Sequence, residues 1–192
     1  MIVRGLVICG LMILGVPGGA VRGAEEVGKI MRPAEGAAMP TDQVDIIATA
    51  PGGKLELDGK PVSAEQPFPN VLHLNLKASA GAHTLALIWE GGRKEVHFFV
   101  GAKPPAEFHP FRQHPPLAGV QCTQCHELSK RGRFRFKDES CFACHQQQGF
   151  VKIHTHEPSV LAECGLCHNA HGATTKAFLM QSKEASCKLC HN

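Results

Sequence analysis

Apolar and polar residues alternate in short stretches between Asp42 and Val100, and this pattern predicts β-strands. Turn signals separate the stretches, and Asp58-Gly59 is a strong signal for a two-residue hairpin. Pro51-Gly-Gly53 and Glu90-Gly-Gly92 supply two further turns. The clearest predicted strands cover 44–48, 54–58, 71–76, 82–89 and 93–100.

Five or six short strands with turns between them predict a small immunoglobulin-like β-sandwich for residues 42–101. A lead-in rich in Gly, Ala and Pro precedes it at 24–41, and a Pro-rich linker follows it at 102–108. A module of this kind docks or spaces rather than catalyses. Three histidines within the predicted strands are interpreted as ordinary sheet residues: His73, His83 and His97.

Residues 1–23 have the pattern of a secretory signal peptide. Arg4 gives a positive start, an apolar run follows from Leu6 to Val16, and small residues surround Ala20. The run is shorter than the roughly 20 apolar residues of a membrane-spanning helix, so an uncleaved anchor is the alternative and the one route to membrane association. Cys9 is interpreted as part of the signal core, because Ile8 is too bulky for a lipid-attachment site. We therefore expect a periplasmic or extracellular protein.

The strand pattern stops after residue 108. Residues 109–192 have no apolar periodicity long enough to build a conventional core. So short a region needs covalent cross-links or a cofactor to hold it together. We expect short helices and coil, organised around such cross-links or such a cofactor.

The sequence Cys-x-x-Cys-His occurs four times in this region and uses every cysteine after Cys9. It is the attachment signature of c-type haem. On a helical turn the two cysteines and the histidine share one face, so both thiols reach the haem edge while the histidine binds the iron. Zinc sites and disulfides are the alternatives, but neither requires a histidine after every second cysteine. The predicted attachment residues are Cys122, Cys125, Cys141, Cys144, Cys164, Cys167, Cys187 and Cys190, and the predicted proximal iron ligands are His126, His145, His168 and His191.

The region also repeats. The segment from His114 to Cys122 aligns with the segment from His156 to Cys164, which divides residues 109–192 into two tandem dihaem units. Here the chain resembles multihaem cytochromes with the doubled CXXCH motif, in the style of the cytochrome c3 class. The second unit is the closer match, whereas the first has Ser129 where the second has His171.

The ligand on the other side of each iron sets the expected chemistry: histidine keeps the reduction potential low, methionine raises it, and an open position admits a substrate. The resemblance and the repeat favour His114, His156 and His171 as distal ligands, and the fourth is His109 or His154. Met180 is the one methionine of the region and is interpreted as packing over a haem face. Bis-histidine ligation throughout would give low-spin, low-potential haems.

Residues 130–137 form a basic run that contains Phe134 and Phe136. The cations are expected to offset haem propionates and the two rings to pack on porphyrin, with docking of an acidic redox partner as a second role. The net charge of +3 is too small to indicate nucleic-acid binding.

These observations predict an electron-transfer protein with four covalently bound haems, acting between redox protein partners and not as an enzyme. A multihaem reductase with one open iron is the first alternative. A haem sensor or a subunit of an envelope complex or self-assembling extracellular filament is another.

Overall fold

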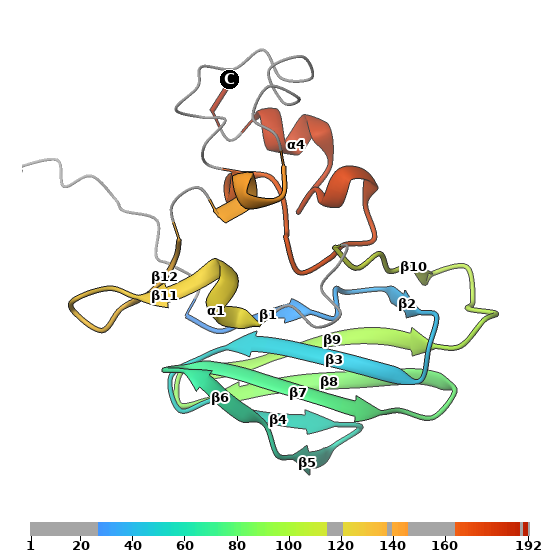
Figure 1. Cartoon of the computed structure of the whole chain (residues 1–192). Coiled ribbons are helices and arrows are strands. Elements are labelled where there is room, and N and C mark those ends of the chain that lie inside the picture. Colours follow the sequence, from blue (N-terminus) through green and yellow to red (C-terminus); the bar gives the residue numbers. More distant parts are fainter. Residues whose placement is uncertain (1–26, 115–120, 138–139, 146–163, 189, 192) are drawn as a thin grey trace, which may run out of the picture.

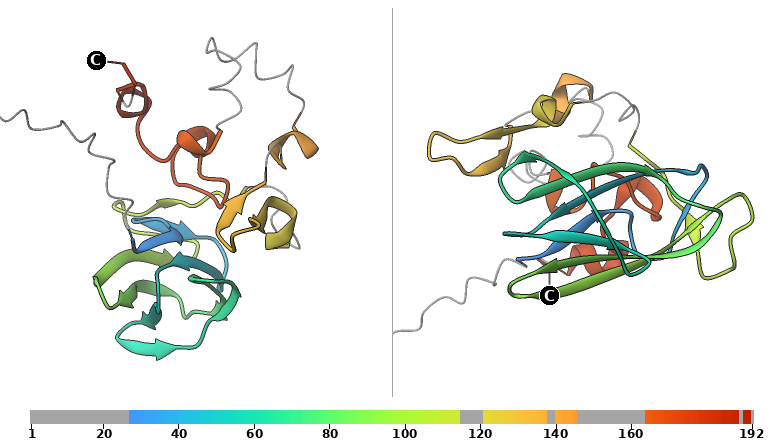
Figure 2. Two further views of the ribbon diagram at one scale, coloured as in Figure 1. Left: turned by 90° about the vertical axis from the view of Figure 1, so that its left-hand side faces the viewer. Right: turned by 90° about the horizontal axis from the view of Figure 1, so that it is seen from below.

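The computed structural model describes residues 27–114, 121–137, 140–145, 164–188 and 190–191. The predicted signal peptide, His154 and His156 lie outside these residues. Two sheets packed face to face form the N-terminal part. The segments that carry the Cys-x-x-Cys-His motifs gather on one side of it, over β1, β2 and β10 (Figures 1 and 2).

The first sheet has four antiparallel strands in the order β1-β3-β7-β6. Strand β6 contains Pro67 and lies at the edge, where a residue without an N–H group is tolerated. The strands are β1 (Lys29–Arg32), β3 (Gln43–Thr49), β7 (Val71–Lys77) and β6 (Glu65–Phe68).

The second sheet has the order β10-β2-β9-β8-β4-β5. Strands β10, β2 and β9 pair in parallel, and the other pairs are antiparallel. The strands are β10 (His109–Pro110), β2 (Ala37–Met39), β9 (Gly92–Val100), β8 (Gly81–Trp89), β4 (Lys54–Leu57) and β5 (Lys60–Val62).

This strand order is that of an immunoglobulin fold. Strands β1, β3, β7 and β6 occupy the positions A, B, E and D of one sheet, and β4, β8 and β9 occupy C, F and G of the other. The predicted β-sandwich is therefore confirmed, and so is the predicted Asp58-Gly59 hairpin turn. It connects β4 and β5, and both of its residues have positive φ, at 52° and 74°.

The core lies between the two sheets. Along β3, Val44, Ile46 and Ala48 alternate with more exposed residues and are fully buried, as a strand with one covered face requires. Leu85 and Phe98 meet them from the second sheet and are also fully buried.

The sandwich is longer than the predicted module of residues 42–101. The predicted lead-in contributes β1 and β2, and the chain after the predicted linker contributes β10. Phe111 is 5% exposed and belongs to the same core, although it lies within the predicted haem region of residues 109–192. These strands have two to four residues each, too short for alternation to be visible in the sequence.

The C-terminal part consists of short helical turns and coil, as predicted, with one two-stranded hairpin that was not predicted. The hairpin pairs β11 (His126–Leu128) with β12 (Phe134–Phe136). The helical elements are α1 (Cys122–Cys125), η1 (Ser140–Ala143), η2 (Cys164–Leu166), η3 (Lys176–Phe178) and α4 (Lys183–Cys187). Across the described ranges, none of the helices combines the length and the apolar character that crossing a membrane requires.

Candidate functional site

The four Cys-x-x-Cys-His motifs fold into the same local turn. In each one the backbone N–H of the histidine donates to the carbonyl oxygen of the first cysteine, which is one α-helical turn. The N···O distances are 2.9 Å for His145, 3.0 Å for His168 and 2.9 Å for His191. Both cysteines and the histidine of each motif therefore share one face, the arrangement that haem attachment needs.

None of the eight motif cysteines, all of which lie in the described ranges, forms a disulfide. The first two motifs lie close together, since α1 contacts η1. Burial raises the pKa of the Cys125 thiol, and the neighbouring Cys144 raises it further. In the described residues, no three His, Cys, Asp or Glu side chains converge as a metal-binding group.

His145, the histidine of the second motif, faces His114. Their Nε2 atoms are 3.5 Å apart and their ring centroids 5.7 Å apart. Two imidazole nitrogens on opposite sides of one metal ion are about 4 Å apart, given metal–nitrogen bonds of about 2 Å. Burial, followed by the nearby His145, lowers the pKa of His114, which favours the neutral form that binds metals. The pair fits a group that is bound from both sides.

His126, the histidine of the first motif, lies beside His171. The ring planes are within 5° of parallel and the centroids are 5.9 Å apart. Two imidazoles on opposite sides of one metal ion have centroids about 6 Å apart. Burial, with smaller contributions from His126 and Arg32, lowers the pKa of His171 to about 4, so the ring is neutral at pH 7. Burial also lowers the pKa of His126, against a backbone hydrogen bond with Arg135 that raises it.

His168, the histidine of the third motif, is oriented by a carbonyl group. Its Nδ1 lies 2.6 Å from the carbonyl oxygen of Ala177, so Nδ1 carries the proton and Nε2 keeps its lone pair. A hydrogen bond of this kind is the usual means of fixing a metal-binding histidine. Ala177 has a φ of 53°, a conformation that is costly for a residue with a Cβ atom.

The two phenylalanines of the basic run surround His126. The Phe134 ring stacks on it at 4.6 Å, and the Phe136 ring meets it edge-on at 5.0 Å. Phe134 also contacts Phe68 of β6, at 4.9 Å between ring centroids. The hairpin β11–β12 therefore connects the first motif to the sandwich.

The remaining candidate ligands are not brought together with a motif histidine in the described ranges. His109 is exposed on β10, where it pairs with Ala37 of the sandwich. Met180 is 44% exposed, and its N–H donates to the carbonyl of Cys167.

The sandwich histidines have local partners. His73 pairs with Asp45 at 2.7 Å, His97 pairs with Glu35 at 3.2 Å, and His83 is buried between Asp58 and the Ser79 carbonyl at 2.8 Å from each.

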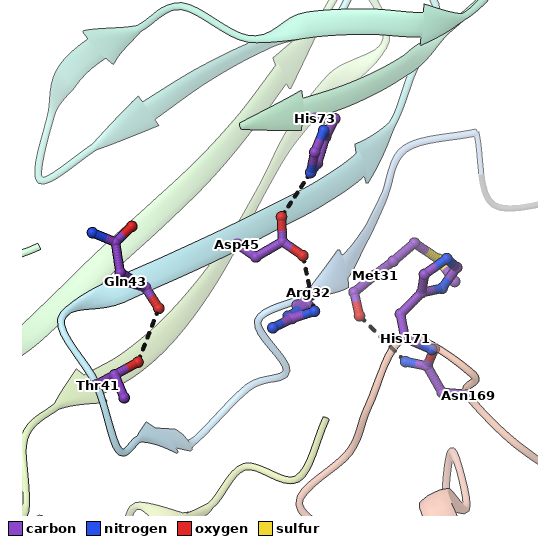
Figure 3. A network of polar contacts seen from close by, with 8 residues as sticks. All are labelled: Met31, Arg32, Thr41, Gln43, Asp45, His73, Asn169 and His171. Carbon is purple, nitrogen blue, oxygen red and sulfur yellow. Dashed lines mark hydrogen bonds and ion pairs between the residues drawn. The ribbon is translucent and has the colours of Figure 1, made fainter. Parts of the chain in front are cut away.

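Sequence reasoning missed the residues that hold His171 in place. Its N–H donates to the side chain of Asn169, which itself donates to the carbonyl oxygen of Met31 on β1 (Figure 3). Arg32 lies next to Met31 and is 2% exposed. Met31 and Arg32 belong to no recognisable motif, and nothing in the sequence indicates that Asn169 contacts a strand 138 residues away.

The comparisons with known proteins cover the two parts separately. Residues 156–192, with the third and fourth motifs, match the doubled CXXCH motif family. This stretch therefore has the doubled attachment motif of c-type haem proteins, and the chain carries a cytochrome c motif of the multihaem type. No curated protein matches the chain.

The sandwich is similar to β-modules in solved structures. The fibronectin(III)-like modules of Clostridium thermocellum CbhA are 19% identical with a TM-score of 0.31, over 38% of this chain and 95% of theirs. Polysaccharide Lyase BACCELL_00875 is 12% identical with a TM-score of 0.31, over 41% of this chain and 12% of its own. The twitchin kinase region from C. elegans is 13% identical with a TM-score of 0.28, over 40% of this chain and 16% of that one.

Proposed function

We propose that the chain is an exported tetrahaem c-type cytochrome that transfers electrons between redox proteins through four closely spaced haems with mainly bis-histidine ligation. The observation that carries the proposal is the pairing of two motif histidines with two further histidines, His145 with His114 and His126 with His171. Covalent haem c supplies one-electron redox chemistry when bound.

The residues take the following roles. In each motif the two cysteines would hold the haem covalently and the histidine would bind its iron. His171 and His114 would be the second ligands at the first and second motifs. His156 and either His154 or His109 would serve the third and fourth motifs. We favour His154 over His109, because His109 lies on a strand of the sandwich beside Ala37.

Electron transfer is a better match to this arrangement than catalysis. Two histidines at one iron leave no position for a substrate, and a pair of imidazoles gives a low-spin centre with a low potential. Contact between α1 and η1 supports a short path between the first two haems. The protein's own contribution is then to hold the haems in sequence and to set their potentials.

The exposed cations of the β11–β12 hairpin support docking of an acidic redox protein. Lys130, Arg131 and Arg133 are exposed along its turn. Such a surface accelerates encounter with a negatively charged partner and loses that effect as salt increases. Export to the periplasm or cell surface is proposed from the N-terminal pattern of the sequence.

The test is to produce the chain in a bacterium that expresses the c-haem maturation machinery and to measure its intact mass after denaturation. Four covalently attached haems are expected in the wild-type protein and three in the double variant Cys164→Ala/Cys167→Ala. A potentiometric titration of the same sample should show one-electron steps at low potential. A protein without covalent haem would refute the proposal.

A further inference from the structure

The β-sandwich contacts the segment that carries His171 through hydrogen bonds and close packing. Asn169 Nδ2 donates to the Met31 carbonyl at 3.2 Å, and Arg112 and Ala173 exchange two backbone hydrogen bonds of 3.0 Å. Gly172 lies so close to the sandwich that a Cβ atom there would be 2.5 Å from the Phe111 ring. These contacts flank His171 on both sides in the sequence, so its position depends on the sandwich.

An ion pair with a buried guanidinium and a partly buried carboxylate lies in the sandwich next to these contacts. The guanidinium of Arg32 binds Asp45 on β3 at 2.8 Å, and Asp45 binds His73 on β7 at 2.7 Å (Figure 3). The Arg32 side chain is 3% exposed, and its Cζ lies 5.5 Å from the centroid of the Phe111 ring. Arg32 and His171 are thus on facing segments of the two parts of the chain (Figure 3).

The Arg32 guanidinium has unused bonding capacity. Its Nε is buried and lacks a hydrogen-bond partner among the described residues. A buried, unpartnered N–H is costly. The positive charge of the guanidinium is compensated by Asp45, which is itself 24% exposed.

The charges of this ion pair lie beside the segment that carries His171. Arg32 and Gly172 approach the same Phe111 ring, and Met31, which precedes Arg32, accepts the hydrogen bond from Asn169. Burial weakens screening by water, so one charge in this place has a stronger influence than the same charge at the surface.

We propose that the sandwich is part of the first haem site and sets its reduction potential, with Arg32 raising the potential and Asp45 lowering it. The inference rests on the proposed function, because it needs a haem held by His126 and His171. When that iron accepts one electron from a redox partner, the site loses one positive charge. A nearby cation therefore favours the reduced form, and a nearby anion favours the oxidised form.

The test compares Arg32→Met and Asp45→Asn with the wild-type holoprotein in a redox titration that is followed by EPR, with haem counted per chain. In Arg32→Met the ratio of reduced to oxidised iron at one haem should fall about tenfold at fixed potential, which is 59 mV for a one-electron couple. In Asp45→Asn the same haem should shift in the opposite direction. The other haems should keep their potentials.

Two variants serve as controls. Arg93→Met removes an arginine that pairs with Glu56 and Glu95 on the same sandwich, and it should shift no haem. Arg32→Lys keeps the charge and should stay close to wild type, which separates loss of charge from loss of packing.

The inference would be overturned if the haem potentials were unchanged in both Arg32→Met and Asp45→Asn, or if the two variants shifted the potential in the same direction. If Arg32→Met does not fold, the direction of the potential shift in Asp45→Asn decides. A wild-type protein without the expected haems would instead refute the proposed function, so the two failures are distinguishable.

Discussion

The rings of His126 and His171 lie parallel within 5° although they belong to different repeats of the chain. His126 completes the first attachment motif, and His171 follows the third. The first repeat has Ser129 at the position that corresponds to His171. A histidine of the second repeat therefore lies beside the first motif, and the two repeats are interlocked.

Replacing His171 should open one iron. In His171→Ala the haem of the first motif loses its distal nitrogen, so one low-spin signal of the oxidised protein should become high-spin while the haem content stays the same. The control is His97→Ala, which removes an exposed histidine that pairs with Glu35 in the sandwich. An unchanged EPR spectrum in His171→Ala would contradict the assignment.

Replacing His114 with methionine should raise one potential. Thioether ligation favours reduced iron, and axial ligands span roughly 0.8 V, so a rise on the order of a tenth of a volt is expected at the second motif. A redox titration monitored by visible spectroscopy measures it. If instead all potentials stay where they were, His114 is not a ligand.

Gly172 should tolerate no side chain. Its φ is +117°, and a Cβ atom would be 2.5 Å from the Phe111 ring and 2.6 Å from the Arg112 carbonyl oxygen. Gly172→Ala should lower the free energy of unfolding by about 2 kcal/mol or more. Urea unfolding measures the loss. Gly165→Ala is the matched control because a Cβ there meets nothing within 4 Å, and equal stability losses in the two variants would contradict the predicted contact.

Asp58 should contribute to stability only above acidic pH. Burial alone would raise its pKa, but hydrogen bonds from the Thr84 N–H and His83 outweigh it and hold the pKa of Asp58 below its ordinary value. A carboxylate with a lowered folded-state pKa stabilises the fold above its unfolded pKa of about 3.9 and loses that contribution as the pH falls through its folded pKa.

Asp58→Asn keeps the turn and should lower the unfolding free energy by about 1 kcal/mol at pH 7. The difference from wild type should shrink towards pH 3, as measured by urea unfolding at both pH values. Asp42→Asn, at an exposed pair with Lys77, should change little. If Asp58→Asn and wild type differ in unfolding free energy by the same amount at both pH values, Asp58 is not a charged partner of His83.

The sequence predicted the parts of the fold that depend only on a few neighbouring residues. Alternation located β3, β7, β8 and β9, and Asp58-Gly59 located a hairpin, because side-chain period and positive φ are properties of a few neighbouring residues. The strands β1, β2 and β10 were not found, since their residues are held by distant partners such as Phe111 in the core.

The candidate site divides in the same way. The four helical turns of the motifs follow from the spacing of cysteine and histidine, and the sequence predicted His114 and His171 as distal ligands. Which histidine faces which motif was not predictable, because it depends on contacts over a long sequence distance, such as that between Asn169 and Met31. The role of Arg32 depends on its burial, which a strand of four residues does not reveal.

The most direct test of the account is the EPR spectrum of the oxidised holoprotein, recorded together with the number of haems per chain. The four attachment motifs predict four haems per chain, and bis-histidine ligation predicts low-spin ferric signals only. A high-spin signal equivalent to one haem or more per chain would contradict bis-histidine ligation and would place a multihaem reductase with an open iron ahead of an electron carrier.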